Sequence, residues 1–237
     1  MDLRHHPATM LHVGFGVVAL LAGLGAMITP KGGRIHRRCG KVFFWSMVVV
    51  AGSAIELAYL SSSLFLFLDT LFTFYLALSG YRALARKRPE RGERANWLDW
   101  LAASVLLASG LGLIAVGVDL QKSGTTGLPA VCFGYGVCAV LFAGHDLHEF
   151  WRPPVTKYHW WLSHMARMLG AYLASVTAVS VVNLHYLPTA VRWFGPILVG
   201  GPGIALWMLY YRRRFRRDTI RVVAQATLRT GASQLEG

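Results

Sequence analysis

Residues Trp97–Leu120 have the sequence WLDWLAASVLLASGLGLIAVGVDL, and this stretch decides the fold class. No charged side chain lies between Asp99 and Asp119. A helix needs about 20 mostly apolar residues to cross a bilayer roughly 30 Å thick, so this segment is long enough to span a membrane. Its apolar residues are continuous and do not alternate with polar ones, which favours a helix over a strand of a membrane β-barrel.

The composition of the whole chain supports the same conclusion. Of its 237 residues, 54% are hydrophobic and only 15% are charged. Soluble domains carry about 25% charged residues, so this chain has too few to cover a soluble particle. The low charge and high apolar content exclude a disordered chain and argue against a soluble nucleic-acid-binding protein. Three cysteines exclude a dense disulfide framework. We therefore expect an integral membrane protein.

Six further stretches are long and apolar enough to span a membrane. The sequence therefore predicts an all-α, polytopic transmembrane helical bundle with about seven spans. We expect a single transmembrane domain over residues 1–211 and a basic cytoplasmic tail over residues 212–237. The three consecutive serines at 61–63 require a tight turn between the second and third spans. The seven predicted spans are Ala8–Ile28, Val42–Leu60, Ser62–Leu84, Trp97–Leu120, Leu128–Phe150, His159–Leu184 and Trp193–Tyr211.

The positions of the basic residues predict the orientation of this bundle. Twenty of the 24 Lys and Arg residues fall in alternate loops and in the tail, and Arg167 lies inside a predicted helix. Only Arg4, Lys122 and Arg192 fall on the opposite side. Because basic loops stay in the cytoplasm, we expect the N-terminus outside and the C-terminus inside a bacterial inner membrane. This topology and contact with anionic lipid account for the net charge of +13 without a nucleic-acid partner.

Glycines are frequent in the first, fourth and fifth predicted spans. The first span alone contains Gly14, Gly16, Gly23 and Gly25. Small residues allow membrane helices to approach closely, so we expect these glycines to lie at helix contacts.

Ionisable residues at membrane depth are costly, so they are the best indicators of function. One set is predicted near the outer surface and consists of His12, Glu56, Asp69 and His185. This outer polar cluster can bind a metal, relay protons or form a hydrogen-bonded group near the interface. A carboxylate that faced lipid would have to be protonated or shielded.

A larger set is predicted at the cytoplasmic surface. His145, His148 and Glu149 have the i, i+3 and i+4 spacing that places side chains on one helix face. His145 and His164 each lie about five residues from the cytoplasmic end of their helices, so we expect them at similar depth. The other ionisable residues predicted at this surface are His36, Asp99, His159 and Arg167.

Haem b is the first ligand that these histidines suggest. A b-type haem needs two axial ligands, and helix bundles build such sites from side chains on facing helices. His145 and His164 meet the depth requirement and form the leading pair. His12, with His185 as its partner, is a candidate for a second haem on the outer side. Two haems would form an electron path across the membrane.

Zinc is the alternative ligand of the cytoplasmic set. Zinc takes histidine nitrogens and carboxylate oxygens. His145, His148 and His164 are the candidate ligands, with Glu149 or Asp146 as general base or outer partner. His36 lies on the same side and is a further candidate. In this interpretation the protein is an intramembrane metal-dependent hydrolase.

Three other interpretations stay open. Histidine and carboxylate chains at both surfaces can relay protons, although the middle of the bilayer contains almost no ionisable residue. Histidine, tryptophan and arginine are also common at headgroup depth, so the cytoplasmic set can be an interfacial anchor. The chain can also be a non-catalytic subunit or anchor of a larger membrane complex.

Three segments together resemble a bacterial family of multi-pass membrane proteins known only as a domain of unknown function. They are Leu11-His12 with its following glycines, the loop His36-Arg37-Arg38-Cys39-Gly40, and His164-Met165-Ala166-Arg167-Met168. The resemblance implies a shared helical bundle and draws attention to His12, His36 and His164. It implies no reaction. The two layers of histidines are separately similar in architecture to di-haem membrane b-type cytochromes, which is analogy alone.

The sequence therefore supports three ranked hypotheses. The first is a haem b-binding electron-transfer protein with a possible redox partner in the membrane. The second is the zinc-dependent hydrolase, and the third is the non-catalytic subunit. A nucleotide-dependent activity is not expected, because the sequence has no phosphate-binding glycine loop and no nucleophile elbow.

Overall fold

The computed structural model describes residues 5–154, 156 and 158–235, with side chains as far as Arg217. It is 85% helical, and the described residues form no strand. Seven of its helices are long and apolar enough to cross a membrane, which confirms the predicted all-α bundle of a multi-pass membrane protein. The helices are α1 Pro7–Ile28, α2 Arg34–Leu60, α3 Leu64–Arg82, α4 Trp97–Lys122, α5 Leu128–Trp151, α6 His159–Asn183 and α7 Thr189–Leu235, with short 3₁₀ turns η2 Ala83–Ala85 and η3 Pro89–Arg91.

Local sequence signals set several of these helix ends. Asn96 and Asp99 form a reciprocal capping box at the start of α4, which satisfies two backbone N–H groups. Ser62 takes a left-handed conformation with φ of 51° in the turn between α2 and α3. Ser63 then accepts a hydrogen bond from the backbone N–H of Leu66 and caps α3. The three serines therefore make the tight turn that the sequence requires.

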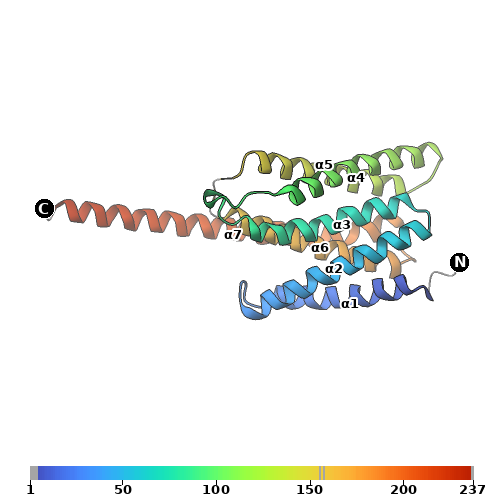
Figure 1. Cartoon of the computed structure of the whole chain (residues 1–237), viewed down its shortest axis with the longest axis horizontal. Helices are drawn as coiled ribbons and strands as arrows, with labels where there is room; N and C mark the ends of the chain where they lie inside the picture. Colours follow the sequence, from blue (N-terminus) through green and yellow to red (C-terminus); the bar gives the residue numbers. More distant parts are fainter. Residues whose placement is uncertain (1–4, 155, 157, 236–237) are drawn as a thin grey trace.

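Helix α3 occupies the centre of the bundle (Figure 1). It packs against α2, α4 and α6, while α1 packs mainly on α2, α5 on α4 and α7 on α6. Most of the buried side chains of the hydrophobic core come from α3, α4 and α5. Helices α1 and α7 bury few residues and expose many large apolar side chains, as expected of helices that face lipid.

Glycines set the spacing of two helix pairs. A Cβ atom on Gly136 would lie 2.8 Å from the carbonyl oxygen of Gly110, so α4 and α5 touch through their backbones there. Gly23 similarly admits the ring of Tyr172 from α6. The expectation fails for Gly14 and Gly16, where an added Cβ would meet open space. These two residues lie on a part of α1 that no described neighbour covers.

The two ends of the bundle differ in charge. Helices α1, α3 and α5 end, and α2, α4 and α6 begin, at what we call the basic end, where the predicted cytoplasmic loops lie. Helix α7 extends beyond the bundle from this end as one continuous helix (Figure 1). The predicted tail therefore begins within a helix. We call the other extremity, near the start of α1, the opposite end. The orientation of these ends in a membrane stays a prediction.

Candidate functional site

A cavity of about 350 Å³ lies at the basic end, between α1, α2, α3, α6 and α7. We call it the basic cavity. None of the described residues that line it is acidic, whereas six are basic or histidine: Lys31, His36, Arg37, Lys41, Lys87 and His164. Its aromatic lining residues are Phe43, Tyr81, Trp160, Trp161, Tyr172 and Trp207. The cavity therefore combines a positive character with a large apolar wall.

Two histidines from different helices line the basic cavity, and in each the Nδ1 atom bonds to a backbone carbonyl. His36 donates from Nδ1 to the carbonyl oxygen of Ala26 at 2.9 Å. His164 donates from Nδ1 to the carbonyl oxygen of Gly80 at 2.8 Å. Because a carbonyl only accepts hydrogen bonds, each Nδ1 carries the proton and a neutral ring keeps its lone pair on Nε2. Both Nε2 atoms are therefore available to a ligand or metal.

The position of His164 depends on Gly80. A Cβ on Gly80 would lie 3.0 Å from the Cβ of Arg167 and 3.0 Å from the side chain of Met168. The absence of a side chain at Gly80 therefore lets α6 approach the backbone of α3 at this point. This close approach brings the imidazole of His164 within hydrogen-bonding distance of the Gly80 carbonyl.

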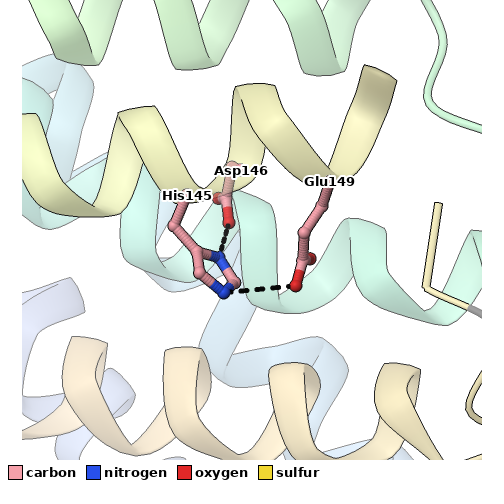
Figure 2. Close-up of side chains that lie close together, drawn as sticks. All are labelled: His145, Asp146 and Glu149. Carbon is pink, nitrogen blue, oxygen red and sulfur yellow. Dashed lines mark hydrogen bonds and ion pairs between the residues drawn. The ribbon is translucent and has the colours of Figure 1, made fainter. Parts of the chain in front are cut away.

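A histidine–carboxylate cluster, made of His145, Asp146, Glu149 and His159, occupies a separate place at the basic end. Figure 2 shows its first three members on α5. His145 Nδ1 lies 3.4 Å from Asp146 Oδ1, and His145 Nε2 lies 3.2 Å from Glu149 Oε1. His159, the first residue of α6, places its Nε2 2.9 Å from Glu149 Oε2. The His145 side chain is 59% exposed, so the described protein leaves the cluster open on that side.

Asp146 extends this cluster into the core. Its Oδ1 accepts from Arg167 at 2.5 Å, and its Oδ2 accepts from the hydroxyl of Tyr75. Arg167 also stacks over the ring of Phe142, with 4.4 Å between the guanidinium carbon and the ring centroid. The ion pair links α5 to α6, and Tyr75 adds α3. Burying a charge in the bundle requires a partner of this kind.

A second ion group holds α3 against α4. Arg82 donates to both oxygens of Asp99, at 3.1 Å and 2.7 Å, and Arg86 donates to the same carboxylate. Asp99 also serves in the capping box of α4. Its position is therefore explained by structure alone.

The structure separates the two histidines of the leading haem pair. His164 lines the basic cavity, whereas His145 does not line it and instead contacts Asp146 and Glu149. The zinc set is divided in the same way, since only His145, Asp146 and Glu149 lie together among its described members. His148 is exposed on α5, and His36 accompanies His164 in the cavity.

The predicted outer cluster is also dispersed within the part of the chain that the structure describes. His12 donates to the carbonyl of Val50 at 3.1 Å and lies 3.3 Å from the hydroxyl of Ser53. Glu56 and His185 are exposed. The buried Oδ1 of Asp69 has no hydrogen-bond partner among the described residues. The candidate outer haem pair, His12 and His185, is not brought together.

Two functional features were not predicted from the sequence. The first is that His36 and His164 line the same cavity. It was missed because nothing in the sequence spacing shows that α2 and α6 share a cavity. The second is the contact of His159 with Glu149. Arg167 within a span was a usable signal, since an intramembrane arginine requires a nearby acceptor and Asp146 lies at similar depth.

Comparisons with known proteins add no identity to this geometry. No protein-family model matches the chain, and neither a curated protein nor a solved structure matches it.

Proposed function

We propose that the protein binds haem b in the basic cavity, with His36 and His164 as axial ligands, and takes part in electron transfer. One observation carries the proposal. Two histidines on different helices line a single cavity, and each is fixed through Nδ1 by a backbone carbonyl. A hydrogen bond from the second ring nitrogen is the usual way in which proteins orient a metal-ligating histidine.

The lining of the cavity suits both the apolar ring and the anionic propionates of a haem. The macrocycle is apolar, and the aromatic residues with Met165 and Met168 offer it an apolar wall. The two propionates are anionic, and Lys31, Arg37 and Lys41 offer them cations. The absence of a carboxylate among the described lining residues removes the repulsion that propionates would otherwise meet.

The proposed pair replaces His145 with His36. His145 has carboxylate neighbours at both ring nitrogens, whereas the Nε2 of His36 has no such competitor in the described contacts. A second haem is not proposed, because His12 and His185 have separate surroundings.

The chain's own residues would orient the haem and direct its partner. A bound haem supplies one-electron transfer, and its potential depends on the axial ligands and the surrounding charge. The carbonyls of Ala26 and Gly80 hold the imidazoles. The basic residues around the cavity raise the local positive potential, which would attract an acidic redox partner to the basic end.

The test is the absorption spectrum of the detergent-purified protein, oxidised and then reduced with dithionite. The wild type should have a Soret band and a sharpened α-band on reduction. His36→Ala and His164→Ala should each lose that spectrum, while His148→Ala and His185→Ala, which change exposed histidines, should keep it. A colourless wild type expressed with ample haem, or unchanged spectra in the first two variants, would overturn the proposal.

A further inference from the structure

We infer that the histidine–carboxylate cluster is a zinc site, with His145, Glu149 and His159 as ligands and Asp146 as the outer partner. This site is separate from the basic cavity and independent of the proposed haem. It differs from the zinc set expected from the sequence, because His159 takes the place of His148 and His164.

The donor atoms have the chemistry and spacing of a zinc site. Zinc favours imidazole nitrogen and carboxylate oxygen, and bonds of about 2.0–2.1 Å at tetrahedral angles place ligand atoms about 3.3 Å apart. The two Nε2 atoms lie 3.2 Å and 2.9 Å from the two oxygens of Glu149. Ligand atoms of His145, Asp146 and Glu149 lie within 4.8 Å of one another, and the His159 ring would have to turn toward His145 for both histidines to bind the same cation. The cation would then replace two histidine–carboxylate contacts.

The positions of α5 and α6 bring these three side chains together. His145 and Glu149 are i, i+4 neighbours on the last two turns of α5, so the helix itself sets their separation. His159 begins α6, the next helix of the chain. The Ser163 hydroxyl lies 3.3 Å from the Nε2 of His159 and would have to release that nitrogen for it to bind the metal.

Asp146 gives the site an outer partner. Its Oδ1 lies 3.4 Å from the Nδ1 of His145, which leaves the Nε2 of that ring for the metal (Figure 2). Carboxylates in this position orient metal-binding histidines and raise their basicity. Because Asp146 is itself fixed by Arg167 and Tyr75, it cannot readily swing outward to become a ligand. We therefore assign it a positioning role.

The site keeps a position for a further small ligand. Three protein ligands leave one position on a tetrahedral zinc for water or another ligand. A second cavity, of about 50 Å³, adjoins Glu149 and His159. It is also lined by Lys87 and Arg94, which would favour an anionic fourth ligand, together with the acidic Glu93 and with Arg86, which is paired with Asp99.

Zinc titration of the purified protein tests this assignment. The full chain, carrying a purification tag without histidines, is stripped with EDTA in detergent and titrated with zinc chloride against a chromophoric zinc indicator. We expect one zinc per chain. His159→Ala and Glu149→Gln should weaken binding at least tenfold, and Asp146→Asn should weaken it about 10- to 100-fold, the usual effect of losing an outer partner.

Two control variants separate this site from its neighbours. His148→Ala changes an exposed histidine of the same helix, and His185→Ala changes an exposed histidine at the opposite end, so both should bind zinc as the wild type does. Zinc should also raise the melting temperature of the wild type but not that of folded His159→Ala, which distinguishes lost ligation from misfolding. The absence of stoichiometric zinc, equal binding in His159→Ala, or loss of binding in His148→Ala would overturn the assignment.

Discussion

Asp146 and Asp69 are two aspartates within membrane spans, and they differ in their hydrogen-bond partners. Asp146, near the basic end of α5, accepts hydrogen bonds from Arg167 and Tyr75 and contacts His145. Asp69, in the second turn of α3 toward the opposite end, has a buried Oδ1 with no hydrogen-bond partner among the described residues. An unpaired polar group in an apolar interior costs free energy, whereas a paired one links helices. The carboxylate of Asp146 is therefore compensated, although the Nη1 of its partner Arg167 is also buried without a hydrogen-bond partner among the described residues, whereas the Oδ1 of Asp69 has no compensation.

Breaking the ion pair between Arg167 and Asp146 should have the largest effect on the free energy of unfolding. Arg167→Met leaves Asp146 buried without its cation, and removing one partner of a buried ion pair costs about 3–5 kcal/mol. Adding Asp146→Leu should recover a large part of this loss, because two apolar side chains can replace a buried ion pair. The free energy of unfolding in mixed micelles, measured by denaturant titration, checks both expectations.

Arg94→Met is the matched control, since Arg94 is exposed at the same end. Surface substitutions of this kind change stability by about 0.5 kcal/mol or less. If Arg167→Met were no more damaging than Arg94→Met, the ion pair would not hold the basic end together.

Removing the carboxyl group of Asp69 should instead increase the free energy of unfolding. Asp69→Leu should raise the free energy of unfolding by about 1–2 kcal/mol, because an unsatisfied buried polar group costs about 1–3 kcal/mol. Glu56→Leu is the control at the same end, and its exposed side chain predicts little change. A loss of stability in Asp69→Leu would show that the carboxyl has a partner that the isolated chain lacks, such as a bound ion.

The apolar runs alone predicted the fold, and the reason is physical. In a bilayer every backbone polar group must be satisfied within its own helix, so a run of about 20 apolar residues has few alternatives. The tight turn at residues 61–63 followed from the same reasoning. The seven helices were therefore predictable, although their lateral order was not.

A similar depth could be expected from the sequence, but lateral placement could not. His145 and His164 were expected at similar depth on consecutive helices, and that reasoning cannot say which neighbour each side chain faces. The packing of α6 against α3 at Gly80 gives His164 the carbonyl of that residue as its partner and places it in the cavity with His36. Such pairing depends on contacts between distant segments, which no local spacing records.

Lys31 should have the smallest effect on stability, and its compensation is intermediate between that of Asp146 and that of Asp69. It lies in the loop between α1 and α2, outside the spans, and donates to the carbonyls of Ala26 and Met27 at the end of α1. Partial burial nevertheless lowers its pKa below the ordinary lysine value. Between the lowered and the ordinary pKa the unfolded chain binds more protons than the folded one, so stability should rise slightly as pH increases through that window.

Unfolding of the wild type and of Lys31→Gln between about pH 8 and about pH 11 measures this rise, since the ordinary lysine pKa of about 10.4 falls within that range. The variant should lack the contribution of Lys31, and an identical slope in both proteins would contradict the expectation. If haem binds in the basic cavity as proposed, a propionate beside Lys31 would stabilise the ammonium group and oppose the effect of burial. Lys31 would then change from a cation held by backbone carbonyls alone to one paired with an anion, as Arg167 is with Asp146.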